Sequence, residues 1–311
     1  MADETNIGWC DHTLNWWHGC AEVASGCENC YARELTKRFT KQVVWGAKAP
    51  RLIVKGAPAS VQRWQTAAAK EGGKKRVFCG SMMDIFERPR PLVDRDGKMI
   101  MNVMTGDLRR SFFNMITDGA WPNLEFQLLT KRPANINKCI PESWMSGRAP
   151  DNVLFGTSVS EQTDVDIYVG KLVECTPRDS RRFLSVEPMI RRVDIRRYLA
   201  YIDWVIIGGE SGPKARPMHP WWATELAEQC HDAGIPVFMK QQGAWSVVDR
   251  EGDTEVNDIA LHFGGSSVNY LGWADMIVKD SHGMWKRMRK GNTHGTELND
   301  IPEGWRVQEF P

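Results

Sequence analysis

Three cysteines lie close together near the start of the chain. Cys20, Cys27 and Cys30 follow the spacing C-x6-C-x2-C in a stretch punctuated by Gly19 and Gly26, which is typical of a loop. Thiolates held this close repel one another unless a cation or a cluster neutralises them, and thiolates prefer soft metals. The spacing therefore predicts a metal site that holds either zinc or an iron–sulfur cluster.

Zinc and an iron–sulfur cluster differ in the ligands they need. A structural zinc site takes four nitrogen or sulfur ligands, so zinc would recruit Cys10 or His18 as the fourth. Three cysteines alone leave one coordination position open, which suits a catalytic site. The other cysteines are solitary and lie in apolar or helical surroundings, where we expect small buried side chains: Cys79, Cys139, Cys175 and Cys230.

The rest of the chain predicts the elements that position this loop. Six short apolar runs without polar alternation are typical of parallel strands covered on both faces: 76–79, 125–129, 152–155, 182–184, 204–207 and 236–239. Helices are expected between them at 162–174 and at 221–233, where Gly234 ends the second helix. This alternation predicts an α/β fold, either a parallel barrel or a doubly wound sheet.

Polar side chains follow these strands, among them Asp84, Lys131, Glu187, Glu210 and Lys240. In a parallel barrel the carboxyl ends of the strands form the active-site face, so these side chains predict a lined cavity. Helix capping explains residues such as Thr157 or Ser211, but not a glutamate or a lysine. An expected first strand at 13–17 and first helix at 31–42 put the cysteine loop on the same face. That placement favours catalysis over a purely structural metal.

Blocks along nearly the whole chain resemble one known family. Residues 15–20 and 26–32, which contain the cysteines, are similar to a phage- and prophage-encoded family with a three-cysteine motif, described as radical-SAM-like and of unsettled function. Further matching blocks are 81–86, 129–133, 185–188, 208–212, 215–217, 239–242 and 308–311. The resemblance implies a partial parallel (β/α) barrel of the radical-SAM type over residues 1–243, with an insertion near 85–112. A C-terminal extension over 244–311 is expected to cap the barrel.

The resemblance also implies a chemistry. Cys20, Cys27 and Cys30 would ligate three irons of a [4Fe–4S] cluster, and the fourth iron would bind S-adenosylmethionine. An electron from a small donor of the flavodoxin or ferredoxin type would then release a 5′-deoxyadenosyl radical. The cofactor supplies this chemistry, and the protein supplies orientation and exclusion of water.

Cofactor-binding residues follow from the same resemblance. The segment from Ser81 to Asp84 matches the position that binds the methionine amine, and Lys131 or its neighbour Arg132 would face the methionine carboxylate. Ser158 and Glu187 fall where contacts to the ribose and the polar end are expected. The loop is three residues longer than the common C-x3-C-x2-C spacing, and Asn29 stands where an aromatic residue often lies near the adenine, so Tyr31 is expected to take that role.

Substrate is expected opposite the cysteine loop, against residues from the later strands: Glu187, Glu210, Lys240 and Gln241. We expect a nucleobase or nucleotide, as in hypermodification of phage DNA, with peptide modification and small-metabolite chemistry as open alternatives. Mixed basic and aromatic stretches at 45–64 and 285–290 are typical of nucleic-acid contacts, although a solvated helix face with inward tryptophans gives the same pattern. The alternative function is a zinc-stabilised barrel that binds nucleic acid or acts as a hydrolase without radical chemistry.

Composition sets the outer limits. The 311 residues carry 40 basic against 39 acidic side chains, so the protein lacks the charge of one that wraps a duplex electrostatically. No apolar run approaches the ~20 residues of a membrane span, and the acidic start of the chain is unlike a signal peptide. We therefore expect no membrane partner and a cytoplasmic location, the host cytoplasm if the protein is phage-encoded.

Overall fold

A computed structural model describes residues 5, 7–248, 260–263, 266–271, 275–279 and 285–290. The chain divides into two compact units. One comprises Met1–Ser158 and Ile167–Leu184, and the other comprises Val159–Asp166 and Ser185–Pro311. The cysteine loop belongs to the first unit, and the predicted substrate residues belong to the second.

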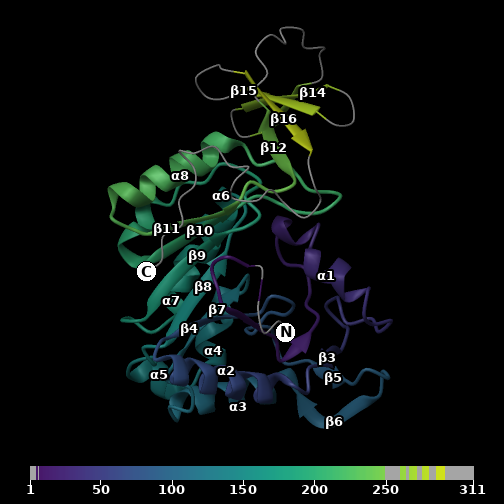
Figure 1. Cartoon of the computed structure of the whole chain (residues 1–311), viewed down its shortest axis with the longest axis vertical. Helices are drawn as coiled ribbons and strands as arrows, with labels where there is room; N and C mark the ends of the chain where they lie inside the picture. The colour runs from purple at the N-terminus through teal and green to yellow at the C-terminus, as the bar shows by residue number, and fades with distance from the viewer. Residues whose placement is uncertain are drawn as a thin grey trace. The chain divides into compact units, whose positions relative to one another are not determined.

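A seven-stranded sheet is the main element of the fold (Figure 1), with the order β1-β4-β7-β8-β9-β10-β11. The strands are β1 (His12–Leu14), β4 (Lys75–Cys79), β7 (Leu124–Thr130), β8 (Val153–Ser158), β9 (Arg181–Val186), β10 (Trp204–Gly208) and β11 (Val237–Gln241). The neighbours β1/β4, β4/β7, β7/β8 and β10/β11 pair in parallel. All six predicted apolar runs are confirmed as strands, and the fold is α/β with a partial parallel barrel.

The expected first strand at 13–17 is wrong in extent. β1 stops at Leu14, and Trp17 begins β2 (Trp17–His18) in a different sheet. Asn15 separates the two strands because its side chain is committed to the loop after β4: its Nδ2 donates to Ser81 Oγ (2.8 Å) and its Oδ1 accepts from Met82 N (2.8 Å).

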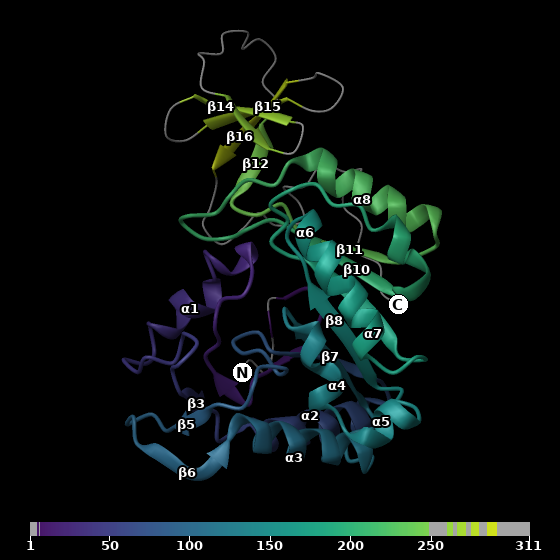
Figure 2. The same ribbon diagram turned by 180° about the vertical axis from the view of Figure 1, so that it is seen from behind.

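Helices cover the sheet, as Figures 1 and 2 show for α2, α3, α4 and α7 of the first unit. Their bounds are α1 (Tyr31–Thr36), α2 (Ala57–Glu71), α3 (Thr105–Thr117), α4 (Ile136–Cys139), α5 (Glu142–Ser146), α6 (Gln162–Asp164), α7 (Gly170–Cys175) and α8 (Pro220–Asp232). The helix expected at 162–174 is interrupted by a π-helical turn, η3 (Val165–Val169), and α1 is shorter than expected. At the end of α8, Gly234 adopts φ +70°, as predicted.

The insertion contributes to a second sheet with the order β2-β3-β5-β6. Its other strands are β3 (Arg51–Ile53), β5 (Pro91–Val93) and β6 (Met99–Met104). β5 and β6 pair antiparallel, and their turn is closed by Asp94, whose N–H donates to Lys98 O (3.0 Å). Gly97 takes φ +81° there, where an L side chain would be strained.

Aromatic side chains fill both faces of the sheet in the first unit. Phe126 packs on Phe112 of α3 (ring centroids 5.2 Å apart) on the helix-covered face. On the opposite face, Trp9 lies between Phe78 of β4 (4.5 Å) and Phe183 of β9 (6.5 Å). Gly156 makes room for Phe183, because a Cβ on Gly156 would lie 2.4 Å from that ring. The N-terminal segment thus closes this side of the sheet.

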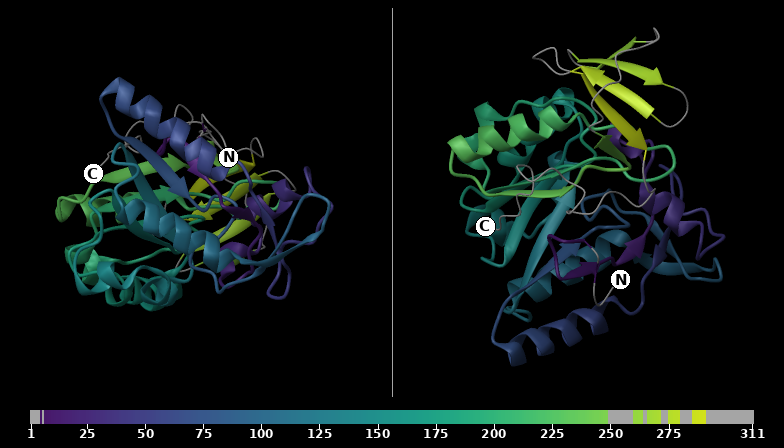
Figure 3. Two further views of the ribbon diagram at one scale, coloured as in Figure 1. Left: turned by 90° about the horizontal axis from the view of Figure 1, so that it is seen from below. Right: turned by 45° about the horizontal axis from the view of Figure 1, so that its top comes forward.

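The C-terminal extension contains a five-stranded antiparallel sheet (Figure 3), with the order β12-β16-β15-β14-β13. Its strands are β12 (Trp245–Val248), β13 (Ala260–Phe263), β14 (Ser266–Leu271), β15 (Asp275–Lys279) and β16 (Trp285–Lys290). The basic and aromatic stretch at 285–290 therefore forms β16. The matching block at 308–311 lies outside the described residues, as do the segments 249–259 and 291–307 that would belong to the expected cap.

Candidate functional site

The cysteine loop follows β2 and is built from tight turns. A 3-10 turn, η1 (Ser25–Cys27), leads into α1, and the N–H of Cys30 donates to Cys27 O (3.3 Å), so these two cysteines sit on consecutive turns. The loop is tied at its start, because Gly19 N donates to Met82 O (3.0 Å) and Gly46 N donates to Cys20 O (2.8 Å). Gly19 is required there: its φ is +114°, and a Cβ would lie 2.1 Å from Val44 O.

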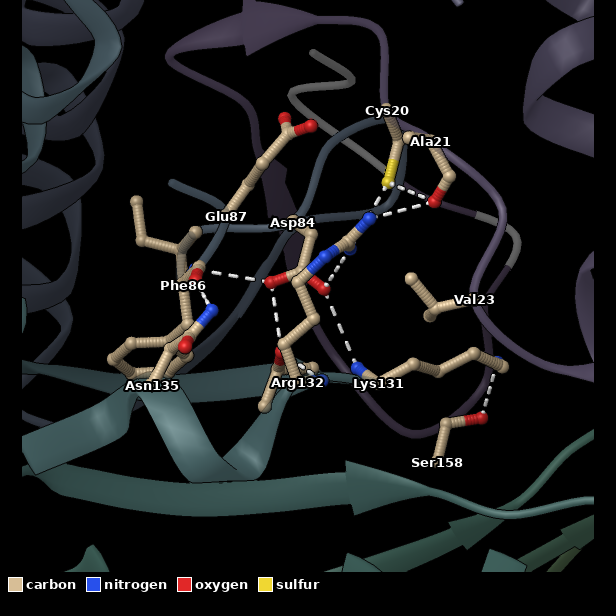
Figure 4. Close-up of polar contacts among 12 residues, drawn as sticks. Cys20, Ala21, Val23, Asp84, Phe86, Glu87, Lys131, Arg132, Asn135 and Ser158 are labelled. Atoms are coloured by element: carbon tan, nitrogen blue, oxygen red, sulfur yellow. Dashed lines mark hydrogen bonds and ion pairs between the residues drawn. The ribbon is translucent and has the colours of Figure 1, made fainter. Parts of the chain in front are cut away.

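Cys20 is linked to Arg132 at the carboxyl end of β7, as Figure 4 shows. Arg132 Nη1 lies 3.4 Å from Cys20 Sγ and 2.7 Å from Asp84 Oδ2, and Nη2 donates to Ala21 O (2.6 Å). One guanidinium therefore joins a carboxylate to the first cysteine of the loop.

Asp84 is a buried carboxylate whose two oxygens are engaged. Oδ1 accepts from Thr130 Oγ1 (2.7 Å) and from Phe86 N (2.9 Å), while Oδ2 accepts from Arg132. The residue is 4% exposed. Sequence analysis assigned Asp84 to a cationic amine of the cofactor; in the structure its cationic partner is Arg132.

Burial and charge set the protonation of Cys20. Desolvation, reinforced by the negative charge of Asp84, raises the pKa of its thiol to about 12, although Arg132 acts in the opposite direction. Burial alone would lower the pKa of Arg132, but Asp84 and Cys20 raise it, so the guanidinium stays charged. In the metal-free protein Cys20 is a thiol at neutral pH, and a metal that binds its sulfur must displace the proton.

The donor set of the loop is that of a soft metal or an iron–sulfur cluster. Three partly buried cysteines occupy eleven residues, from Cys20 to Cys30. The pKa of Cys30 is raised, chiefly by burial, and Cys27 contributes to that shift through its charge. Within residues 7–248 no three His, Cys, Asp or Glu side chains converge on one point as metal ligands. The three cysteines therefore match such a group in donor chemistry and share one loop, but their sulfurs would have to move together to bind it.

Cys10 and His18, the alternative zinc ligands, each make a packing contact of their own. Cys10 is buried, and its thiol faces Ile7 O (3.8 Å) before β1. His18 packs edge-on against Phe39 (5.1 Å), and burial, with help from the N-terminal charge and Arg95, lowers its pKa to about 4. Neither contact occupies a ring nitrogen of His18, and both nitrogens are buried without a hydrogen-bond partner among the described residues, so the zinc alternative stays a prediction.

Other predicted cofactor residues meet beside this loop. Tyr31, the first residue of α1, donates its hydroxyl to Ser81 O (2.9 Å), so α1 is tied to the loop that follows β4. At the ends of the adjacent strands β7 and β8, Lys131 Nζ lies 2.6 Å from Ser158 Oγ. Within the first unit, contacts thus connect Tyr31 to Ser81, Lys131 to Ser158, and Cys20 through Arg132 to Asp84, whereas Glu187, also expected to bind the cofactor, belongs to the second unit.

The predicted substrate residues form two ion pairs in the second unit. Lys240 Nζ lies 2.7 Å from Glu187 Oε1, which fits over Gly208, where a Cβ would come within 2.7 Å of the same oxygen. Glu210 is 5% exposed and accepts from Arg216 three times, from N (2.8 Å), Nε (2.8 Å) and Nη2 (2.7 Å). An arginine thus covers the carboxylate that was expected to face substrate.

Gln241 and the capping candidates make strand-end contacts. Gln241 Nε2 donates to Ser211 Oγ (2.6 Å) and to Gly209 O (3.1 Å). Thr157 donates to Thr130 O across β7 and β8 (3.0 Å) rather than capping a helix. Both contacts fix the loops at the carboxyl ends of strands.

In the basic and aromatic stretch at 45–64, Arg51 and Trp64 are buried, whereas Lys48, Lys55 and Arg63 are exposed. Arg51 is fully buried in an ion pair with Glu87, and Trp64 is 3% exposed and stacks on His12 (4.5 Å). Their burial removes Arg51 and Trp64 from the expected nucleic-acid contacts. Trp64, on α2, is an inward tryptophan as in the helix-face alternative, whereas Arg51 lies in β3.

Sequence reasoning missed the partners of the predicted residues more than the residues themselves. Asn15, Glu87 and Arg216 hold site loops, yet Asn15 and Arg216 stand in their motifs without a role, and Glu87 lies just outside the block 81–86. Arg216 follows the strand-end carboxylate of Glu210 by six residues. A cationic residue shortly after such a carboxylate is the sequence pattern that could have predicted the Glu210–Arg216 ion pair.

Residues 4–300 match a protein family described as a protein of unknown function, DUF5131. The chain belongs to this family. No curated protein sequence matches it. Among solved structures, the chitinase domain of the spore coat protein CotE from Clostridium difficile is similar at 10% identity with a TM-score of 0.26, covering 92% of this chain and 81% of that one. A structural similarity this weak supports no inference about the protein described here.

None of the helices that the structure describes has both the length and the apolar composition to cross a bilayer.

Proposed function

We propose that this protein is a radical S-adenosylmethionine enzyme in which Cys20, Cys27 and Cys30 hold a [4Fe–4S] cluster. The observation that supports it best is the convergence of the cysteine loop with the charged ends of β4, β7 and β8 in one unit. Arg132 contacts Cys20, and Lys131, next to it in the chain, contacts Ser158. When reduced with S-adenosylmethionine bound, such a cluster supplies a 5′-deoxyadenosyl radical.

The chain's own residues would bind and orient this cofactor. Lys131 places a cation at the strand ends, where it would pair with the methionine carboxylate, and Ser158 offers a hydroxyl beside it. Tyr31 is 53% exposed and its hydroxyl is fixed on Ser81 O, and in this proposal its ring would lie against the adenine. Because Asp84 is engaged by Arg132, we assign it to holding the loop rather than to contacting the amine.

The proposed substrate is a nucleobase or nucleotide. Glu187, Lys240 and Gln241 present a carboxylate, an ammonium and an amide, a set that hydrogen-bonds to the polar edge of a base. Glu210 would act through Arg216, whose guanidinium it orients. A small flavodoxin- or ferredoxin-type donor would supply the electron.

Metal analysis of anaerobically purified and reconstituted protein tests the cluster. We expect a brown protein with about four irons per chain and a charge-transfer absorbance that disappears on reduction. A colourless protein with one zinc would replace this proposal with the zinc-stabilised barrel. Binding of oligonucleotides and free nucleotides to the cofactor-loaded protein tests the substrate separately, and failure of all of them would refute the nucleobase assignment alone.

A further inference from the structure

Arg132, which contacts Cys20, also forms a buried ion pair with Asp84. The side chains of Arg132 and Asp84 are 12% and 6% exposed, and the ion pair between them is 2.7 Å long. A buried pair is retained only where its geometry is specified, because desolvation of both charges offsets much of their attraction. Thr130 Oγ1 and Phe86 N fix the carboxylate, and the carboxylate in turn fixes the guanidinium.

The remaining guanidinium donors are directed at the cysteine loop. Nη1 reaches Cys20 Sγ (3.4 Å) and Nη2 reaches Ala21 O (2.6 Å), so Arg132 contacts both a side chain and the backbone there (Figure 4). The other ties at the start of the loop, from Gly19 and Gly46, are between backbone groups. Among the described residues, Arg132 is the side chain that donates to the Cys20 sulfur.

We propose that Asp84 and Arg132 are a positioning pair for the first cysteine of the loop. Asp84 orients Arg132, and Arg132 holds the loop at Ala21 and donates an N–H to the Cys20 sulfur, both in the metal-free protein and with a cluster bound. The second half of this statement depends on the proposed function. Hydrogen bonds to a ligand sulfur stabilise the more negative, reduced cluster, so the pair raises the reduction potential.

Hydrogen–deuterium exchange of the metal-free protein tests the positioning without any iron. In Arg132→Gln, amides in residues 20–31 should exchange about tenfold faster or more, the effect of losing one charge-assisted hydrogen bond. Arg132→Lys should not restore protection, because one ammonium cannot reach Asp84, Cys20 and Ala21 together. Arg181→Gln is the matched control, since Arg181 also bridges a carboxylate and a carbonyl, Glu125 and Asp151 O, away from the loop.

The midpoint potential of the reconstituted cluster tests the sulfur contact. Arg132→Gln should shift the potential to more negative values, because it removes a positive charge and an N–H donor from beside the Cys20 sulfur. Asp84→Asn also removes a negative charge, which acts on the potential in the opposite direction, so its effect is measured by exchange at residues 20–31, where it should reproduce that of Arg132→Gln. Arg181→Gln should keep the wild-type potential. A role limited to folding would not produce this pattern.

The results for exchange, potential and iron uptake test different parts of the proposal. Wild-type exchange in Arg132→Gln overturns the proposal, and so does faster exchange with an unchanged potential, because the sulfur contact is then without effect. If the wild-type protein takes up no iron, the proposed function fails, while faster exchange confined to 20–31 in Arg132→Gln still supports the positioning of the loop.

Discussion

Replacing Glu87 by Gln should destabilise the first unit severely. Arg51 is completely buried, its Nε donates to Glu87 Oε2 (2.9 Å), and its Nη2 bonds the other carboxylate oxygen. Its Nη1 donates to the carbonyls of Val44 (2.9 Å) and Ala49 (2.8 Å). Glu87→Gln removes the negative charge but leaves the guanidinium in place.

The magnitude follows from that burial. Leaving one charge of a buried pair uncompensated costs about 3–5 kcal/mol, a large part of the total stability of a typical domain. By contrast, Glu174→Gln breaks the exposed pair between Glu174 and Lys171, whose side chains are 63% and 46% exposed, and should change stability little because solvent screens that pair.

Native-state hydrogen exchange of β3 and β4 amides is the assay, because the chain has two units and global unfolding need not be two-state. We expect Glu87→Gln to reduce protection by about two to four powers of ten and Glu174→Gln to leave it nearly unchanged. Gly46, whose carbonyl also accepts from Arg51, donates to Cys20 O, so the first variant should also impair iron uptake. A loss of protection below about tenfold would refute the reasoning, because the guanidinium would then have found another partner or water.

Three further predictions concern the loop and the second unit. Cys27→Ala should abolish iron uptake, whereas Cys10→Ala should keep nearly the wild-type iron content, as measured by metal analysis; equal losses would indicate a four-cysteine site. In the metal-free protein, His18 is held neutral with a pKa of about 4 against 6.5 when unfolded, so the stability of the first unit should fall as the pH drops from 6.5 to 4, by about 1–3 kcal/mol in native-state hydrogen exchange corrected for intrinsic exchange rates. His18→Gln should flatten that dependence, and an unchanged slope would contradict the assignment. Glu210→Gln should free Arg216 yet keep the iron content and the cleavage of S-adenosylmethionine without substrate; loss of the cluster would make Glu210 structural.

The sheet could be predicted because its signal is local. Each strand of the main sheet after the first is a short apolar run that ends in a polar cluster. Because these strands are buried on both faces, apolar and polar residues do not alternate along them, and each strand reads as one continuous apolar run. β3 and α2 were not predicted from the sequence. β3 has only three residues, and one of them is Arg51, a charged residue of the type usually found on the surface. Its burial depends on Glu87, 36 positions later, and no local pattern shows that pairing.

The site residues were predictable by type and position, but their partners were not. Strand-end order put Asp84, Lys131 and Ser158 on one edge, and the structure brings them together. Two neighbouring cations, Lys131 and Arg132, follow the same strand. The directions of their side chains decide the pairing: Arg132 contacts Asp84, and Lys131 contacts Ser158. The same limit applies to Glu210, since its pairing with Arg216 depends on the course of a loop between them.

Reductive cleavage of S-adenosylmethionine tests the central claim most directly. Reconstituted wild-type protein, reduced with dithionite under anaerobic conditions, should convert S-adenosylmethionine to 5′-deoxyadenosine and methionine, detected by mass spectrometry. The Cys27→Ala protein treated in the same way should form none. A wild-type protein that carries four irons but yields no 5′-deoxyadenosine, or one that binds only zinc, would contradict the account.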